Sequence, residues 1–232
     1  MSSSPTAVID RRVSGPCCAL ARFHAADQVV RVQRYPSDMT DAEWAVIEAG
    51  LPAPSWLTGE GGRPEKHCRR VMIDAIRYLV DNGIKWRAMP VDFPGWTSVY
   101  GFFTRFTAAR DLQVLHDRLR DKVRVRDGHD SQPSAAIIDS QSVKAAETVG
   151  VDDRGFDGGK NVNGRKRHII VDVLGMLLLV LVTPANFNDR AVMDPMFRVL
   201  RRRFPLVGLI WADGGYTGPL VDWAREKLQL IV

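Results

Sequence analysis

The sequence predicts a two-part chain of the mixed α+β or α/β class, with a helical region followed by a mixed β-sheet that carries helices. Apolar residues recur at helical spacing between residues 35 and 126, which predicts short amphipathic helices. After residue 134, short aliphatic runs bounded by turn residues predict strands. We therefore expect an extension over 1–34, a helical domain over 35–126 and a sheet domain over 134–232.

The composition is that of a globular protein with a basic surface. Hydrophobic residues make up 45% and charged residues 25% of the 232 residues, which is ordinary for a chain that buries a core. The net charge of +5 and the pI of about 9.3 favour a polyanionic partner. No membrane partner is expected, because the longest apolar stretch, Met176 to Val182, is too short to cross a bilayer.

The cysteines and the N-terminus indicate a compartment. Cys17, Cys18 and Cys68 form no CxxC pair, and an odd number predicts no disulfide framework. A reducing cytoplasm fits this usage. Residues 1–34 begin with a Ser-rich stretch, lack the apolar segment of a secretion signal and show little periodicity, so we expect a disordered extension there.

The first two helices have clear start and stop signals. Thr40-Asp41-Ala42-Glu43 is a capping box ahead of the apolar Trp44, and Pro52 should end this helix. A second helix is expected from about His67 to Asn82, with Gly83 as its C-cap.

Two further helices complete the helical region. Thr97 or Ser98 should cap the third, which carries Val99, Phe102 and Phe106, and the fourth runs over 112–123. Short helices joined by tight turns are compatible with a helix-turn-helix DNA-binding unit, and equally with any small helical bundle.

Basic residues in this region favour the DNA-binding interpretation. Phosphate contacts need such charges, and these contacts supply most of the non-specific affinity for DNA. The alternative for each residue is a solvated helix face. The candidates gather at the start of the second helix and around the third: Arg63, Lys66, Arg69, Arg70, Lys85 and Arg105.

The second half alternates strands and helices. The predicted elements are, in order, strands over 135–139, 167–172 and 176–182, a helix over 190–203 capped by Asp189, a strand over 207–212, a helix over 219–228 and a strand that starts at 230. The second and third strands form a hairpin across Leu174-Gly175. This order is the layout of ribonuclease-H-like domains, in which the first and fourth strands are neighbours.

Two aspartates follow the first and fourth of these strands. Asp139 ends one apolar run, and Asp213 ends the other and precedes Gly214-Gly215-Tyr216. A carboxylate just past a buried strand emerges at the carboxyl edge of the sheet, where open α/β proteins build their sites. Two such carboxylates on adjacent strands could share an oxygen-preferring cation such as Mg²⁺. The alternative is that each aspartate only caps the following turn.

Several stretches match a known family in order and spacing. They are Tyr35–Trp44, Lys85–Pro90 with Asp92–Pro94, Ile137–Lys144, Gly158–Lys160 with Gly164–His168, Pro184–Asn186 with Asp189-Arg190, and Trp211–Tyr216. Together they resemble bacterial insertion-sequence transposases of the DDE type, in insertion-sequence family five. The similarity runs from about Tyr35 to the end of the sequence.

The resemblance implies a DNA transposase that holds two divalent cations, Mg²⁺ or Mn²⁺, and that cuts and transfers DNA strands. It implies that Asp139 and Asp213 are catalytic metal ligands. Lys160 and the run Arg165, Lys166 and Arg167 would hold phosphates near the cut, the alternative being a solvated loop. The implied partners are double-stranded DNA, at element ends and target, and further copies of the chain in a synaptic complex on the nucleoid.

The resemblance also implies a third carboxylate, a Glu on a helix after the fifth strand. The sequence stops at Val232, within that strand; Glu226 precedes the strand, and Asp172 has no family motif behind it. We therefore expect a truncated product with little or no catalytic activity. Two other functions stay open: a non-catalytic DNA-binding regulator or remnant of a transposable element, and a generic ribonuclease-H-like nuclease, against which the helical region argues.

Overall fold

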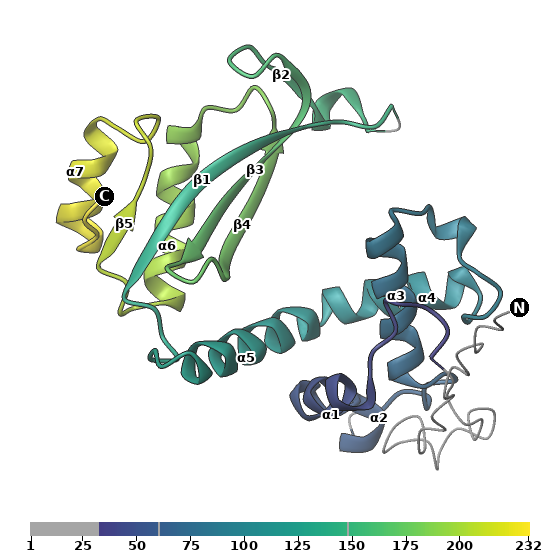
Figure 1. The fold of residues 1–232 in the computed structure, drawn as a ribbon. Coiled ribbons are helices and arrows are strands. Elements are labelled where there is room, and N and C mark those ends of the chain that lie inside the picture. The colour runs from purple at the N-terminus through teal and green to yellow at the C-terminus, as the bar shows by residue number, and fades with distance from the viewer. Residues whose placement is uncertain (1–32, 60, 148) are drawn as a thin grey trace, which may run out of the picture. The chain divides into compact units, whose positions relative to one another are not determined.

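The computed structural model describes residues 33–59, 61–147 and 149–232 (Figure 1). The chain divides into two compact units, with the boundary between Leu119 and Arg120. The first, the helical unit, contains helices, and the second, the sheet unit, contains a mixed sheet with helices. This mixed α+β composition agrees with the predicted fold class.

The helical unit follows the predicted helices closely. Its elements are α1 (Asp41–Gly50), α2 (Ser55–Thr58), α3 (Arg69–Asn82), the 3-10 helix η2 (Trp86–Ala88), α4 (Trp96–Ala108) and the first turns of α5 (Asp111–Arg126). The capping box is confirmed: the Thr40 hydroxyl accepts from Glu43 N at 3.2 Å, and the Glu43 carboxylate accepts from Thr40 N at 2.7 Å. Gly83 ends α3 with a φ of 60°, as predicted.

The predicted cap of the third helix is wrong. α4 begins at Trp96, one residue before Thr97, and its N-cap is Gly95, which offers no side-chain hydrogen bond. Both hydroxyl residues are therefore inside the first turn. The packing of α4 explains its position, because Val99, Phe102 and Phe106 are buried in one cluster with residues of α3 and α5.

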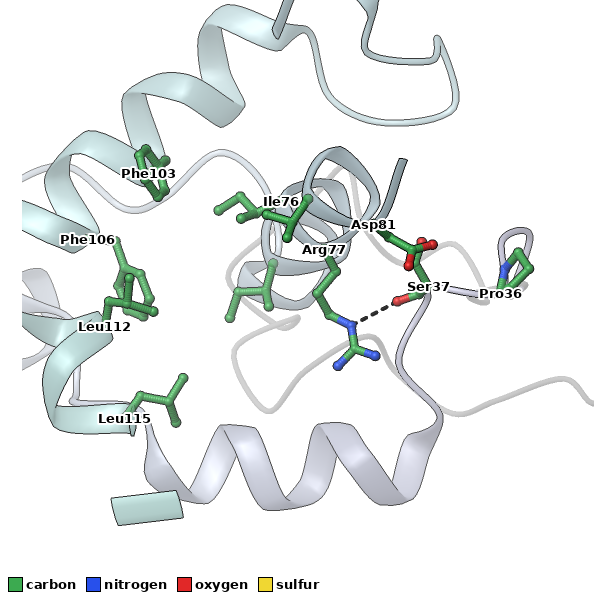
Figure 2. A pocket seen from close by; sticks show the side chains of 11 residues that line it. Pro36, Ser37, Ile76, Arg77, Asp81, Phe103, Phe106, Leu112 and Leu115 are labelled. Atoms are coloured by element: carbon green, nitrogen blue, oxygen red, sulfur yellow. Dashed lines mark hydrogen bonds between the residues drawn. The ribbon is translucent and has the colours of Figure 1, made fainter. Parts of the chain in front are cut away.

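An apolar cavity of 520 Å³ lies beside this cluster (Figure 2). Its walls include Ile76 of α3, Phe106 of α4 and Leu115 of α5. At one side Arg77 donates its Nε to the carbonyl of Ser37 at 2.9 Å, which ties α3 to the segment before α1.

The sheet unit contains the remaining elements. They are β1 (Ala135–Lys144), the 3-10 helix η3 (Val151–Asp153), β2 (Gly155–Asp157), β3 (Val162–Asp172), β4 (Leu177–Pro184), the 3-10 helix η4 (Asp189–Val192), α6 (Met193–Arg203), β5 (Leu209–Trp211) and α7 (Pro219–Leu228). The hairpin of β3 and β4 is confirmed, with Gly175 in its turn at a φ of 76°.

The sheet has the order β2-β3-β1-β5, and β4 also pairs with β3. β1 is antiparallel to β3 and parallel to β5, so the sheet is mixed. The predicted neighbourhood of the first and fourth strands is thereby confirmed. The chain after α7 returns to the sheet at Ile231, which forms a parallel bridge with Leu209.

Three predicted boundaries in this unit are wrong. The second strand, β3, begins at Val162 and not at Arg167. The first strand does not stop at Asp139 but continues to Lys144, because β3 begins at Val162 and pairs with it along that length. The helix predicted from Arg190 is preceded by the 3-10 turn η4, whose cap is Asn188 rather than Asp189: the Asn188 side chain accepts from Arg190 N at 2.9 Å.

The two faces of β1 differ in their surroundings. Ala136 and Ile138 are buried in the main core with residues of α6 and α7. Alternate residues, including Ile137 and Asp139, are exposed on the other face. Figure 1 shows α6 running along one side of the sheet. The sheet therefore has a covered face and an open face, and Asp139 lies on the open one.

Candidate active site

Asp139 and Asp213 follow the paired residues of two neighbouring parallel strands, β1 and β5. The register of β1 with β5 pairs Ile137 with Trp211. Asp139 and Asp213 each lie two residues further along, at the carboxyl end of the shared ladder. Both side chains are exposed. The register therefore puts both residues just past the carboxyl end of the β1–β5 ladder, which is where open sheets build their sites.

Local backbone groups orient both carboxylates. Asp139 Oδ1 accepts from Ser140 N at 2.7 Å, and Asp213 Oδ1 accepts from Gly215 N at 2.9 Å. A Cβ at Gly215 would lie 2.9 Å from that same Asp213 oxygen, which is closer than real Cβ atoms approach. A side chain at Gly215 would therefore displace the Asp213 carboxylate from this position.

Tyr216 lies under this pair of carboxylates. Its side chain is buried in the main core at 2% exposure. Burial, and then the negative charge of Asp189 and of the candidate ligands Asp213 and Asp139, raise the pKa of its hydroxyl far above the ordinary value of 10.0. Tyr216 therefore stays protonated. Asp189 lies near the loop that carries Asp213, since a Cβ at Gly215 would be 4.0 Å from its Oδ2.

A buried polar network occupies the covered face of the sheet beside Asp189. The Lys166 ammonium donates to the carbonyl of Phe187 at 3.0 Å and lies 3.3 Å from Asp189 and 3.6 Å from Asp157. The fully buried His168 places Nδ1 3.5 Å from the same Asp189 carboxylate. Burial lowers the pKa of His168, so its imidazole is neutral at pH 7.

The 3-10 turn η4 holds the loop that carries Asp213. Arg190 donates from Nε to the carbonyl of Gly215 at 3.3 Å and from its terminal nitrogen to the Thr217 hydroxyl at 3.0 Å. This gives a structural role to the Asp189-Arg190 motif: Asp189 joins the buried network, and Arg190 spans to the loop.

The basic run at the start of β3 divides between the two faces of the sheet. The register pairs Arg167 with Gln141 and Arg165 with Val143, so both arginines share the open face with Asp139. Arg167 donates to the Gln141 side chain at 2.7 Å. Lys166 has the opposite orientation and belongs to the buried network. The Lys160 ammonium donates to the carbonyl of Ser140 at 2.8 Å, next to Asp139.

The basic residues predicted in the helical unit also differ in their environments. Arg70 is 2% exposed, donates to the carbonyl of Met39 at 2.8 Å and pairs with Asp41 at 2.7 Å. Arg69 is buried, pairs with Glu65 at 2.8 Å and donates to the carbonyl of Pro52 at 2.7 Å. These two guanidinium groups hold the fold together. The other four are exposed: Arg63, Lys66, Lys85 and Arg105.

The two other carboxylates considered in the sequence lie in different surroundings. Asp172 is fully buried at the end of β3, where it pairs with Arg124. Glu226 lies on α7. Within the described residues, no group of three or more His, Cys, Asp or Glu side chains could hold a metal ion. The two exposed carboxylates have the hard oxygen donors that Mg²⁺ prefers, and they fit as two ligands of a larger set.

Sequence reasoning missed the buried network. The run at 165–167 was predicted to lie in a loop. Strand alternation extended toward the N-terminus from the predicted strand at 167–172 puts Lys166 and His168 on one face and the two arginines on the other. No local sequence pattern indicates that Asp157 belongs to this network, because its contact with Lys166 depends on the turn between β2 and β3.

Two family models match the chain, one in each unit. Residues 39–116 match a family described as a putative transposase of the IS4/5 family (DUF4096), and residues 130–231 match the transposase DDE domain. The searches of curated proteins and of solved structures found no match. Within the described residues, none of the helices is both long and apolar enough to span a membrane. The two family matches together indicate a transposase of the IS4/5 type, whose DDE domain is the sheet unit.

Proposed function

We propose that the sheet unit binds divalent cations and acts on DNA phosphodiesters, and that the helical unit binds double-stranded DNA at element ends. Within the IS4/5 type, the motifs favour insertion-sequence family five. The observation that supports the proposal is the parallel register of β1 and β5, because Asp139 and Asp213 each follow the paired residues Ile137 and Trp211 by two positions. Paired carboxylates at adjacent strand ends can bind the metal ions that phosphoryl transfer requires.

The residues on the open face have complementary tasks in this proposal. Asp139 and Asp213 would hold Mg²⁺ or Mn²⁺, which when bound stabilises the attacking and leaving oxygens of phosphoryl transfer. Arg165 and Arg167 share this face and would hold the DNA backbone beside the carboxylates. Lys166 would act from the covered face, by holding Asp189 in place.

Metal binding tests the proposal without requiring activity. A Mn²⁺ titration of the full chain, followed by electron paramagnetic resonance, should show binding that Asp139→Asn and Asp213→Asn each weaken by roughly 10- to 100-fold or more. Asp194→Asn is the matched control, because this exposed aspartate pairs with Arg198 on α6. Equal affinities in all four proteins would contradict the assignment.

A second function is favoured by one observation: the described residues contain no three-ligand metal group. Two carboxylates place Mg²⁺ poorly, because this ion demands near-octahedral order. A chain that binds DNA without cutting it would act as a regulator that occupies element ends. Nicking of a supercoiled plasmid with Mg²⁺ or Mn²⁺, measured beside DNA binding, separates the two. We expect binding with little or no nicking from this chain alone.

Assembly belongs to the same proposal. A transposase joins two DNA ends, so we propose that copies of the chain associate in a synaptic complex on the nucleoid. Sedimentation of the chain with and without a duplex should show DNA-dependent association. A protein that stays monomeric on every duplex would argue for the regulator instead.

A further inference from the structure

We infer that α4 is the element of the helical unit that reads base edges in the major groove of DNA. This inference rests on the proposed function, because it requires the helical unit to bind DNA, and it deepens that function by naming the surface that selects a sequence. It follows from the outward face of α4, from the charges around it and from the chemistry of its side chains.

α4 is amphipathic, and most side chains on its outward face are polar. Val99, Phe102 and Phe106 are buried in the core of the helical unit. The exposed positions of the helix are Thr97, Ser98, Tyr100, Thr104, Arg105, Thr107 and Ala108. An α-helix of this width fits the major groove when its outward side chains are short. Phe103 and Phe106 of α4 line the cavity in Figure 2.

The outward face of α4 also lacks negative charge. α4 contains no Asp or Glu, whereas the other helices of ten or more residues that begin in the helical unit all carry at least one: α1 has Glu43, α3 has Asp81 and α5 has Asp111. A carboxylate facing DNA would repel the phosphates. The sequence therefore leaves α4 as the long helix of this unit that a polyanion can approach.

Cations bracket α4 at both ends. Lys85 and Arg87 precede it, and the Arg87 guanidinium lies 5.3 Å from the centre of the Trp96 ring at the first position of the helix. Arg110 lies just after its end. Lysine and arginine on both sides of a groove-binding helix can hold the two phosphate backbones that flank the groove.

The acid in this stretch is already paired. Between residues 83 and 110 the sequence has one carboxylate, Asp92. It forms an ion pair with Arg34 at 2.8 Å and accepts from the Tyr35 hydroxyl at 2.7 Å, a bond that raises the pKa of Tyr35 to about 12. The charge that residues 83–110 leave for a partner is therefore positive.

The outward side chains have the chemistry of base recognition. The hydroxyls of Thr104 and Thr107 donate to helix carbonyls at 2.9 Å, which leaves their methyl groups for contact with a thymine methyl. Arg105 can donate two hydrogen bonds to a guanine. A Cβ at Gly101 would lie 3.3 Å from the Arg105 guanidinium, so the arginine extends along the outward face over this glycine.

Selection from a pool of random duplexes tests the inference with the full chain and needs no knowledge of the natural site. Arg105→Ala and Ser98→Ala should change the preferred sequence at one or two base positions, and at each position the wild-type preference should fall by roughly 10- to 100-fold. Lys85→Ala should keep the preferred sequence, weaken binding to all duplexes and lower the salt slope by about 1. Circular dichroism of each exposed-site variant checks that α3 and α4 remain folded.

The outcomes separate the inference from the proposed function. Wild-type protein that selects no sequence would overturn both. Selection by the wild type, with the same sequence chosen by the Arg105→Ala and Ser98→Ala proteins, would overturn the role of α4 alone. A changed sequence with the α4 variants, and an unchanged one with Lys85→Ala, would support it. If the α4 variants keep the base preference but lose binding to another protein, α4 serves a protein partner, which also overturns the inference.

Discussion

Replacing Asp172 by Asn should destabilise the sheet unit by several kcal/mol without altering the candidate ligands. Asp172 is fully buried and pairs with Arg124, which is itself 4% exposed. Asp172 Oδ1 also accepts from Leu174 N at 3.0 Å and Met176 N at 2.8 Å in the hairpin turn. Asp172 is therefore a structural residue of the β3–β4 hairpin.

The magnitude follows from what the substitution removes. An asparagine keeps an amide oxygen that can accept the two backbone bonds of the turn. It removes the negative charge that faces the buried Arg124 guanidinium. Loss of one partner of a buried ion pair costs about 3–5 kcal/mol, because the remaining charge stays in the interior without compensation. By contrast, an exposed pair contributes about 0–1 kcal/mol.

Hydrogen exchange followed by mass spectrometry measures this loss in the sheet unit alone. Peptides from β3 and β4 should exchange roughly 100- to 4000-fold faster in Asp172→Asn, which corresponds to the expected 3–5 kcal/mol. Asp127→Asn is the control, because its pair with Arg126 is exposed and 3.4 Å long. If the free energies of unfolding of the two variants differ by less than about 1 kcal/mol, Asp172→Asn does not leave the Arg124 charge buried and uncompensated.

Three further predictions follow from the sheet unit. Burial lowers the pKa of His168 below 6.5, so the unfolded chain binds a proton at this histidine more readily than the folded chain does. The free energy of unfolding should therefore fall as the pH drops through 6.5. Between pH 7 and pH 5 the melting temperature should fall less in His168→Gln than in the wild type. Gly164→Ala should prevent folding, because the added Cβ would lie 1.9 Å from the Val143 carbonyl oxygen. Gly208→Ala should fold normally, because nothing lies within 4 Å of a Cβ at that position. Circular dichroism of the two variants tests this difference. Arg190→Ala should weaken Mn²⁺ affinity by roughly 10- to 100-fold in the titration above, and an unchanged affinity would show that Arg190 does not hold the Asp213 loop.

The predictable parts of the fold are those that depend on near neighbours in the sequence. The capping box at Thr40 and Glu43 closes within four residues, and Gly83 ends α3 because its own backbone takes a left-handed conformation. The neighbouring strands that lead to Asp139 and Asp213 could also be expected, because the order of the elements resembles that of ribonuclease-H-like domains, in which the first and fourth strands are neighbours. These features need no knowledge of side-chain packing.

The wrong boundaries arise from tertiary partners that the local pattern does not contain. The segment from Ser140 to Lys144 is polar and has the composition of a loop, but β3 pairs with it along its whole length. At α4, burial of Val99 and Phe102 sets where the helix begins, so Gly95 takes the cap position although it has no side chain to offer. Long-range pairing and packing override local preference at both places.

The extension of the strands also decides what the basic run at 165–167 can do. In a loop, Arg165, Lys166 and Arg167 would all be available for DNA. In a strand, alternation sends the two arginines to the open face beside Asp139 and sends Lys166 into the network with Asp189. The three charges therefore have different surroundings: under the proposed function the two arginines would hold DNA, whereas Lys166 pairs with Asp189 and Asp157 on the covered face. A DNA-binding defect in Lys166→Met would then be accompanied by a loss of stability, whereas one in Arg167→Met would not.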